Sequence, residues 1–537
     1  MPLRRFSASS VPSVPPPSSL SIFGGLMTEL DKISPRFNIP ASQIEILRGP
    51  VEFYDTLKSK ISNAKRRIYL STLYIGKAEH ELIDTIKEAL RKNPELQVSI
   101  LTDALRGTRE TPKPSCASLL ASLVEEFGEN RVEIRMFHTP NLTGLRKRIV
   151  PRRINEGWGL QHMKLYGIDD ELILSGANLS NDYFTNRQDR YHVFSSKDIT
   201  EYFHRIYTGV TSISYSVLPD KDSEAGYTMT WPETNGCPSP LDDPKSYRVQ
   251  ASRVLKPLIE PPSSAPGQIV GDTVVYPLLQ FTPLLKPEDT STELPAILTI
   301  LRALNPSSNE LKSASDSSHT SLATTPPLQN ASWTFTAGYF NTPPFLRDLL
   351  LSTNPSHGTV IAASPWANGF YGSKGVSGML PAAYTLLGKH FLNAIQKQGL
   401  DDRVKLMEWR RGTVGEPQGW TYHAKGFWVT LAGEDSSELA TSFQPEKDVS
   451  AEERKGPSLT IVGSSNYTKR SYELDLEANA CILTRNPDLM RRLSEEEKWL
   501  QEYAKVVDKK EFEMIERRVG LHVRIAMGIV TLLGGAL

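Results

Sequence analysis

One short pattern occurs twice in this chain. In the stretch EGWGLQHMKLYG a Gly-Trp pair precedes His162 and Lys164, and in PQGWTYHAKGFW another Gly-Trp pair precedes His423 and Lys425. Each His-x-Lys lies in a segment with strand character, where alternate side chains point to the same face. Two copies of a motif in similar surroundings indicate an internal duplication. The chain is therefore expected to fold as two similar halves.

Strands and helices are predicted to alternate in the same order around both copies, over residues 51–134 and again from residue 332. In the second region they follow SWTFTAGYF, PFLRDLLLS, GTVIAAS, LPAAYTLLGKHFLNAIQKQG and RVKLMEWR. Alternation of this kind predicts an α/β sandwich with a mixed or parallel sheet. A chain of 537 residues is long enough for more than one core.

The spacing after each lysine supports the duplication. Gly176 lies 12 positions after Lys164 and Gly463 lies 38 after Lys425, and the difference of 26 equals the polar stretch 432–457. That stretch is typical of a loop inserted between two strands. After this stretch equivalent residues of the two halves again have equal spacing. A carboxylate follows an asparagine by 11 residues in both halves, in the pairs Asn178 with Asp189 and Asn466 with Glu477.

The composition excludes several classes of protein. With 61 basic and 61 acidic residues the net charge is zero, which argues against a general nucleic-acid binder. Three widely spaced cysteines form neither a disulfide framework nor a zinc pattern, and a reducing compartment fits best. Phosphate binding must therefore depend on local clusters of charge.

Both ends of the chain suggest a location at a membrane. The first 28 residues contain Arg4, Arg5, many serines and no acid, which favours a mitochondrial transit peptide over a plain disordered tail. No segment reaches the roughly 18 apolar residues that span a bilayer. At the C-terminus 13 uncharged residues follow Arg524. They suit either a helix at a membrane surface or a buried last helix.

Each half offers histidine, lysine, asparagine and a carboxylate. A carboxylate that accepts a hydrogen bond from one ring nitrogen leaves the other nitrogen free as nucleophile or base. Lysine and asparagine suit an anionic centre in the transition state. Two such sets facing each other would bracket one phosphorus, with one histidine attacking and the other protonating the leaving oxygen. No metal or other cofactor is expected, because two lysines supply the positive charge.

The pattern His-x-Lys-x4-Asp-x6-Gly-[Ser/Ala], followed by an asparagine within two positions, resembles the HKD motif of the phospholipase D superfamily. The resemblance covers about residues 45–505. It implies two α/β/α sandwich halves with mixed sheets that form one active site between them, and a covalent phosphohistidine. Within the superfamily the two copies are most similar to the mitochondrial enzymes that make phosphatidylglycerophosphate and CMP from CDP-diacylglycerol and glycerol 3-phosphate.

The resemblance also implies roles for individual residues. His162 is expected to attack the β-phosphorus of CDP-diacylglycerol, and His423 to protonate the departing CMP and then deprotonate the acceptor. The phosphoryl oxygens would be held by Lys164, Lys425, Asn178, Ser464 and Asn466. Asp189 and Glu477 match the histidine-orienting carboxylates, and we expect Asp189 to be the partner of His162.

The second copy departs from the motif. Thr430 stands where the first copy has Asp169, so Asp169, although part of the catalytic motif, is expected to support the strand. The first copy has Ala177 where the second has Ser464, and so has one hydroxyl donor fewer.

Two basic stretches are further candidates. Arg106 and Arg109, in DALRGTRE, follow a strand, where α/β sheets often bind ligands. They are expected to grip the phosphate of glycerol 3-phosphate, although a solvated turn has about equal weight. The stretch RKRIVPRR, residues 146–153, could meet anionic lipid headgroups or form a solvated loop.

These observations give a division of the chain and a location. We expect a transit peptide or disordered segment at 1–35, halves at 45–215 and 332–505, a linker with a Pro/Ser-rich insertion at 216–331, and a membrane-associating helix at 506–537. The expected partners are the two substrates and an anionic membrane surface, without nucleic acid. The expected location is the matrix side of the mitochondrial inner membrane, as a peripheral protein.

Two other functions stay open on the sequence. One is a phosphodiesterase of the same superfamily, either a phospholipase or an enzyme like the tyrosyl-DNA phosphodiesterases, which also lack the motif's Asp. The neutral charge and the absence of an aromatic, basic groove count against nucleic acid. The other is a non-catalytic lipid-binding protein, and the two complete His/Lys pairs count against this alternative.

Overall fold

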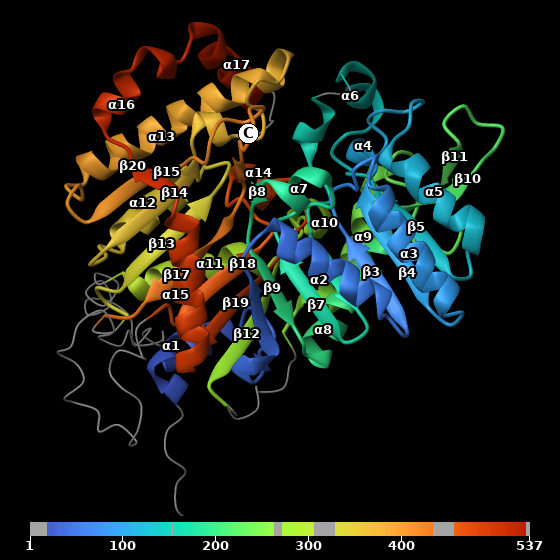
Figure 1. The fold of residues 1–537 in the computed structure, drawn as a ribbon, viewed down its shortest axis with the longest axis horizontal. Helices are drawn as coiled ribbons and strands as arrows, with labels where there is room; N and C mark the ends of the chain where they lie inside the picture. The colour runs from blue at the N-terminus through green and yellow to red at the C-terminus, as the bar shows by residue number, and fades with distance from the viewer. Residues whose placement is uncertain (1–18, 152–153, 262–270, 306–327, 433–455, 533–537) are drawn as a thin grey trace, which may run out of the picture.

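The computed structural model describes residues 19–151, 154–261, 271–305, 328–432 and 456–532. Two nine-stranded mixed sheets form the body of the protein, and each belongs mainly to one half. In Figure 1 the first half, coloured blue to green, lies on the right and the second half, yellow to red, on the left.

The first sheet has the strand order β11-β10-β5-β4-β3-β6-β7-β9-β2. Strands β3, β4 and β5 are parallel to one another, and the other neighbouring strands are antiparallel. In sheet order the bounds are β11 (Tyr227–Thr230), β10 (Tyr215–Pro219), β5 (Val132–Phe137), β4 (Gln97–Asp103), β3 (Arg67–Ser71), β6 (Leu165–Ile168), β7 (Glu171–Ser175), β9 (Tyr191–Phe194) and β2 (Ile44–Leu47).

The second sheet repeats this plan in the order β1-β12-β19-β18-β17-β13-β14-β15-β20. Here β13, β14 and β15 form the parallel part. In sheet order the bounds are β1 (Phe37–Asn38), β12 (Thr273–Gln280), β19 (Glu477–Thr484), β18 (Leu459–Gly463), β17 (Lys425–Thr430), β13 (Ser332–Ala337), β14 (Gly358–Ala363), β15 (Val404–Trp409) and β20 (Ala504–Val506).

Both motif strands begin at the same edge of their sheets. β6 runs antiparallel to β3, so that its first residue, Leu165, lies opposite Ser71 at the carboxyl end of β3. In the second half Lys425, the first residue of β17, lies opposite Ala337 at the carboxyl end of β13. The motif residues therefore lie where the parallel strands end, which is the usual place for ligand sites in α/β sheets.

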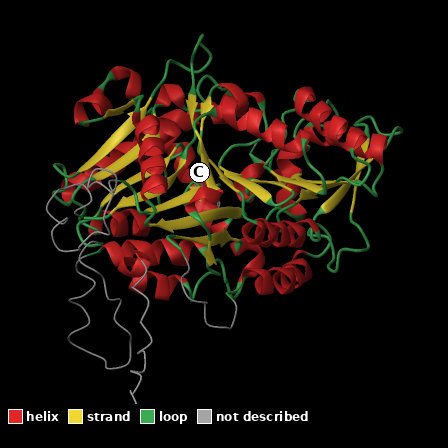
Figure 2. Ribbon diagram, turned by 60° about the horizontal axis from the view of Figure 1, so that its bottom comes forward, coloured by secondary structure: helices red, strands yellow, loops and turns green. Residues whose placement is uncertain are grey.

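Helices cover the sheets, and Figure 2 shows strands between helices in both halves. The helices of eight or more residues among the described ranges are α2 (Pro50–Ser62), α3 (His80–Lys92), α5 (Cys116–Phe127), α8 (Lys197–Thr211), α9 (Pro244–Ile259), α11 (Glu293–Leu304), α12 (Pro344–Ser352), α13 (Leu380–Lys397), α15 (Pro487–Gln501) and α17 (Leu521–Leu532). The shorter ones are α1 (Gly24–Leu30), α4 (Ala104–Gly107), α6 (Gly144–Ile149), α7 (Asn181–Thr185), α10 (Thr282–Leu285), α14 (Lys469–Glu473) and α16 (Lys509–Glu513).

The two halves share a hydrophobic core. It combines apolar side chains of the first sheet, such as Leu172 and Leu174, with side chains of the second, such as Val462, Ala478 and Ala480. Strands buried on both faces read as nearly continuous apolar runs, as ELILS and LTIVG do. This shared core fixes the position of one half against the other.

Of the segment expected to be a transit peptide or disordered at 1–35, the first 18 residues lie outside the described part of the chain. Residues 19–35, expected to be transit peptide or disordered, instead fold against the second half. Leu20, Phe23 and Leu30 are fully buried there, in a core that includes α11 side chains. The apolar positions of SLSIFGGLMTEL form one buried face, and that face secures the segment to the protein.

Much of the expected linker at 216–331 is also part of the two halves. Strands β10 and β11 extend the first sheet, and β12 lies beside β19 in the second sheet, in the place that β2 holds in the first. Its sequence, TVVYPLLQ, is fully buried, as expected of a central strand. The Pro/Ser-rich stretch at 306–327 and most of the loop expected at 432–457 lie outside the described residues.

The C-terminal segment lies on the second half. It forms α16, the 3-10 turn Ile515–Arg517 and α17, and the last helix packs beside α13. Arg517 is buried against Glu408 of β15, with its Nη2 2.6 Å from Oε2. Among the described residues no helix is long and apolar enough to cross a bilayer.

Candidate active site

The histidines are held by backbone pairing between the two halves. The amide of His162 donates to the carbonyl of Leu476 at 2.9 Å, and the amide of His423 donates to the carbonyl of Gln188 at 2.8 Å. The second contact continues a short parallel ladder of β16 (Thr421–Tyr422) and β8 (Arg187–Gln188). Each motif strand therefore begins beside the segment that leads to the carboxylate of the opposite half.

The histidine–carboxylate pairs consequently cross between the halves. Nδ1 of His162 lies 2.9 Å from Oε1 of Glu477, and Nδ1 of His423 lies 2.7 Å from Oδ2 of Asp189. The expectation that Asp189 is the partner of His162 is wrong. Equal spacing in the two halves places Asp189 two residues before β9 and Glu477 at the first residue of β19, and the packing of the sheets then directs each carboxylate across the interface.

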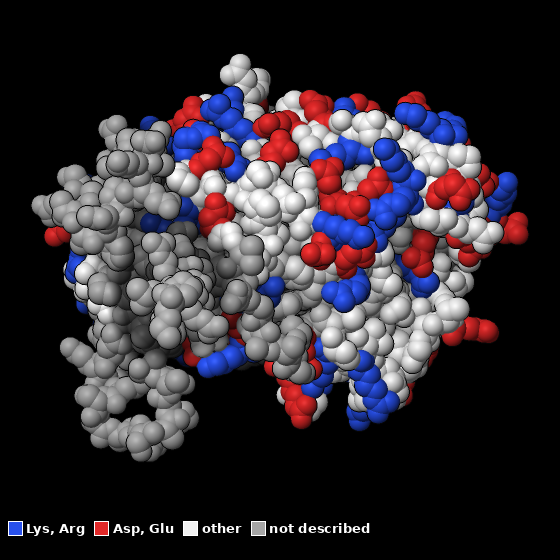
Figure 3. Space-filling view, turned by 90° about the horizontal axis from the view of Figure 1, so that it is seen from below, with Lys and Arg blue, Asp and Glu red and all other residues white. Residues whose placement is uncertain are grey.

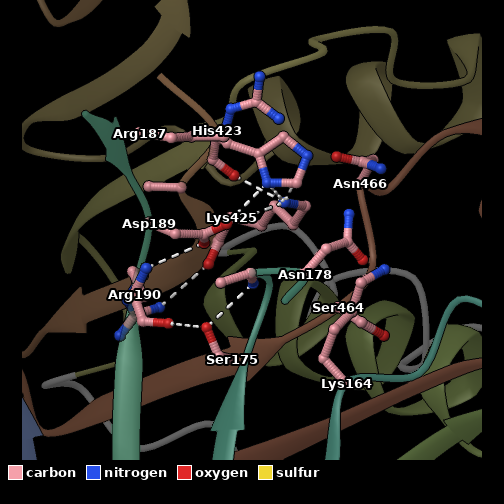
Figure 4. Close-up of polar contacts among 12 residues, drawn as sticks. Lys164, Ser175, Asn178, Arg187, Asp189, Arg190, His423, Lys425, Ser464 and Asn466 are labelled. Carbon is pink, nitrogen blue, oxygen red and sulfur yellow. Dashed lines mark hydrogen bonds and ion pairs between the residues drawn. The ribbon is translucent and has the colours of Figure 1, made fainter. Parts of the chain in front are cut away.

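The lysines lie behind the histidines. The ammonium of Lys164 donates to the carbonyl of His162 at 2.6 Å, and that of Lys425 donates to the carbonyl of His423 at 2.7 Å. Both lysines are buried. Burial lowers the pKa of Lys164 well below its ordinary value and that of Lys425 to about 8, although nearby carboxylates oppose the shift. The ammonium of Lys425 also lies 3.5 Å from Oδ2 of Asp189, and Figure 4 shows these two side chains beside His423.

The polar residues after each lysine gather at the same place. Asn178 donates to the hydroxyl of Tyr183 at 3.2 Å, and Ser464 donates to Oε2 of Glu477. The side-chain oxygen of Asn466 is buried without a hydrogen-bond partner in the described part of the chain. Figure 4 shows Asn178, Ser464 and Asn466 near the His423–Lys425 pair. An orphaned acceptor at this place is consistent with a ligand donor or a water there.

Burial sets the charge of the site. It lowers the pKa of His162 and of His423 well below the usual histidine range, and the neighbouring lysines add to the effect. Burial raises the pKa of Glu477 to about 7 and also raises that of Asp189, while lysines oppose both shifts. At neutral pH both histidines are therefore uncharged, and a neutral ring whose Nδ1 donates to a carboxylate carries a lone pair on Nε2.

Asp169 is not at this site. Its carboxylate accepts hydrogen bonds from the backbone amides of Lys65, Arg66 and Arg67, at 2.9, 2.8 and 3.2 Å. The residue has a positive φ of 52° in the turn after β6, a conformation that aspartate tolerates better than most residues. Asp169 thus fastens the start of β3, and its inclusion among the catalytic residues is corrected.

Arg106 and Arg109 already have protein partners. Arg109 pairs with Glu156, and the guanidinium of Arg106 lies 4.1 Å from the ring centre of Tyr74. Among the interactions of the described residues, neither arginine bonds to a motif residue. Both follow the carboxyl end of β4, so they belong to the edge of the sheet that carries the motif.

The structure adds polar residues that the sequence pattern did not reveal. The hydroxyl of Tyr183 lies 3.3 Å from Nε2 of His423, and Arg187 stacks on the Tyr183 ring at 4.4 Å. Arg470 pairs with Asp475 at 3.0 Å, and its charge helps to lower the pKa of His162. These residues have no matching counterparts at equal offsets in the two halves, so the repeat gave no signal for them.

Comparisons with known proteins agree with the geometry. Residues 57–210 match the family model described as "Cardiolipin synthase, PLD-like domain". A CDP-diacylglycerol–glycerol-3-phosphate 3-phosphatidyltransferase of Saccharomyces cerevisiae is 43% identical over 92% of this chain and 88% of its own length. The human protein of that name, described as mitochondrial, is 33% identical over 92% of this chain and 84% of its own length.

The fold has a counterpart of known structure. The crystal structure of phosphatidylserine synthase from Haemophilus influenzae superposes with a TM-score of 0.66 at 20% identity, and the match covers 95% of this chain and 97% of that one. The prediction of two α/β halves with mixed sheets, like those of the phospholipase D superfamily, is confirmed by this match and by the two observed sheets.

Proposed function

Because the chain belongs to the family of CDP-diacylglycerol–glycerol-3-phosphate 3-phosphatidyltransferases, we propose that it moves the phosphatidyl group of CDP-diacylglycerol to glycerol 3-phosphate and releases CMP. The observation that carries this proposal is the pair of neutral histidines, each oriented by a carboxylate of the opposite half. One histidine can serve as nucleophile and the other as acid and base, as a two-step transfer requires.

In the first step Nε2 of His162 attacks the phosphorus that carries the diacylglycerol. A P–N bond forms, the P–O bond to CMP breaks, and CMP leaves. His162 suits this role because its Nε2 has no hydrogen-bond partner among the described residues, whereas Nε2 of His423 contacts Tyr183 and Lys425 at 3.3 and 3.2 Å. The negative charge of the bound pyrophosphate favours protonation of His423, which then supplies a proton to the leaving oxygen.

In the second step a hydroxyl of glycerol 3-phosphate attacks the phosphatidyl-histidine. His423, now neutral, takes the hydroxyl proton, the new P–O bond forms, and the P–N bond to His162 breaks. The product is phosphatidylglycerophosphate, and both histidines return to their starting state. The Glu477 carboxylate stabilises the positive charge that develops on His162 during each step.

The remaining motif residues surround the phosphoryl group in this scheme. Lys164 and Lys425 supply positive charge, and the side-chain amides of Asn178 and Asn466 supply donors to the non-bridging oxygens. The hydroxyl of Ser464 donates to Glu477, so Ser464 orients that carboxylate in this scheme. For the acceptor phosphate we keep Arg106 and Arg109 as candidates. Arg187 and Arg470 join them because their charges reach the histidines and lower the pKa of His423 and His162 respectively.

The location proposed for the protein is the mitochondrial inner membrane, on its matrix side and as a peripheral protein. It rests on the relatives described as mitochondrial and on the transit-like composition of the first residues. Protease protection of isolated mitochondria, before and after rupture of the inner membrane, tests it. Digestion while that membrane is still intact would contradict the matrix side.

The test of the reaction is the dependence of CMP release on the acceptor. Purified protein with CDP-diacylglycerol and glycerol 3-phosphate should yield CMP and phosphatidylglycerophosphate in equal amounts. With the acceptor left out, release should stop after about one CMP per active site, because the phosphatidyl-histidine then has no partner. CMP release at the same steady rate without acceptor would show a phosphodiesterase instead. Mapping the trapped lipid to His423 would reverse the assignment of the nucleophile.

A further inference from the structure

Large apolar side chains are exposed around the edge of the sheets where both histidines lie. α6 belongs to the connection after β5, and Tyr371 and Val376 belong to the connection after β14. The C-terminal segment is fastened to the same edge. Arg517 bonds to Glu408 near the end of β15 and stacks on Trp366, which follows β14. Three segments far apart in the sequence therefore place apolar groups on one side of the protein.

Helix α6 presents a charged and apolar surface without any acidic residue. Its sequence is GLRKRI, and none of its side chains is buried. Leu145 is 71% exposed and Ile149 is 68% exposed. Residues four apart lie on the same face of a helix, so these two side chains project together. Arg146, Lys147 and Arg148 lie between them, also exposed.

The C-terminal segment offers a second surface of the same kind. Ile515 is 77% exposed, Leu521 is 73% exposed and Ile525 is 54% exposed. Leu521 and Ile525 are again four residues apart, and Val523 on the other side of α17 is buried. The charged residue of α17 is Arg524, and the helix has no acidic residue. Figure 1 shows α6 and α17 along the same upper margin of the molecule, one at each half.

The opposite face of the molecule differs. Where Figure 3 shows it from below, acidic and basic side chains are interspersed on its described part. On α6 and α17 exposed leucine and isoleucine lie beside lysine and arginine without acids, which is the composition of surfaces that lie on anionic lipid. Ile515 lies outside this pattern, between the exposed Glu513 and Glu516. A protein partner would equally cover apolar groups, but the substrate of the proposed reaction carries two acyl chains that must stay in a bilayer.

We propose that α6 and α17 together form a docking surface for an anionic lipid bilayer, with Leu145, Ile149, Leu521 and Ile525 inserted among the lipids and the neighbouring basic side chains at the phosphate level. One contact comes from each half, so docking would direct the edge that carries both histidines towards the headgroups. This inference rests on the proposed function in that the phosphatidyl donor is drawn from the bilayer.

The experiment measures binding and transfer separately. Purified protein is sedimented with vesicles of phosphatidylcholine alone or mixed with phosphatidylglycerol, and transfer is assayed with donor dispersed in detergent. Leu145→Asp and Leu521→Asp, called the rim variants, are compared with Val254→Asp. This control changes another exposed apolar position, which is 37% exposed on α9. Each rim variant should lower binding to the anionic vesicles roughly tenfold, the effect of losing one buried leucine. The control should bind as the unchanged protein does.

The outcomes distinguish the two proposals. If both rim variants keep detergent-based transfer and lose vesicle binding, the docking surface is supported. Loss of vesicle binding in a preparation that shows no transfer under either condition would refute the proposed function and still support docking. Unchanged binding of both rim variants, or equal binding to vesicles with and without phosphatidylglycerol, would overturn docking to anionic lipid. A change from dimer to monomer in the rim variants with vesicle binding intact would identify the surface as a contact between copies.

Discussion

At the scale of single residues, the two carboxylates that hold the histidines have different second partners. Glu477 accepts from Ser464, whereas Asp189 lies near the ammonium of Lys425 and accepts from the backbone amide of Arg190 at 2.9 Å. Glu477, the longer of the two carboxylate side chains, bonds to His162, whose Nε2 has no hydrogen-bond partner within the described ranges. Burial raises its pKa to about 7, so the proton on this carboxylate can limit activity near neutral pH.

We therefore expect the rate of transfer at low substrate to rise with pH through a value near 7. A protonated Glu477 would donate to Nδ1 of His162 and leave a proton on Nε2, which removes the nucleophilic lone pair. Glu477→Gln should lower kcat/KM by roughly a hundredfold or more and should flatten this limb of the profile. The measurement is kcat/KM against pH for both proteins. An unchanged limb in Glu477→Gln would assign the titration to another group.

At the scale of elements, two segments outside the repeated pattern complete the second half. β12 occupies the sheet position equivalent to β2, and α1 covers the core formed around α11. In Figure 1, α1, in dark blue, lies beneath the yellow and orange elements of the second half. The N-terminus of the described chain is thus a structural part of a domain whose motif lies some 400 residues later.

Phe23→Ala should destabilise the protein by about 3–5 kcal/mol, because it removes a fully buried aromatic ring from the second-half core. The free energy of unfolding in denaturant measures this loss. The matched control is Glu29→Ala, at a partly exposed position of the adjoining helix α1, which should cost less than about 1 kcal/mol. Equal stability of Phe23→Ala and the unchanged protein would mean that residues 19–35 do not contribute to the fold.

At the scale of the whole molecule, the site exists only where the two halves meet. Each histidine depends on a carboxylate from the other half. The halves are also joined by a buried ion pair of Arg190 and Glu496, 2.7 Å apart, which includes His192. The shared core and this network hold both sets of motif residues in register.

One complete site within each chain predicts that two inactive variants cannot restore each other. His162→Ala and His423→Ala should each lose transfer by several orders of magnitude. An equimolar mixture should show no more activity than the sum of its parts. The check is CMP release from the two proteins alone, mixed, and mixed after joint unfolding and refolding. Recovery on simple mixing would show that a site forms between chains.

Much of the fold was predictable because it follows from local sequence patterns. The alternation of strand and helix, and the repeat of His-x-Lys with its glycine, asparagine and carboxylate, correctly indicated two α/β halves. The elements between and before the repeats were not recognised. The sequence of β12 is a short apolar run between Pro-rich stretches. Such a run predicts a buried strand but not the sheet to which the strand belongs. Residues 19–35 were grouped with the transit-like first residues because their burial depends on distant parts of the chain.

The sequence by itself determined the repeated core of the candidate site, the two His-x-Lys pairs and their carboxylates Asp189 and Glu477, since equal offsets in two copies place equivalent residues at the same sheet edge. Only the tertiary structure decided how they pair. Spacing along the chain fixes where Asp189 and Glu477 stand within their own halves, but not which histidine each one meets. That choice depends on the packing of one sheet against the other, which brings the segment just before β9 to His423 and the start of β19 to His162.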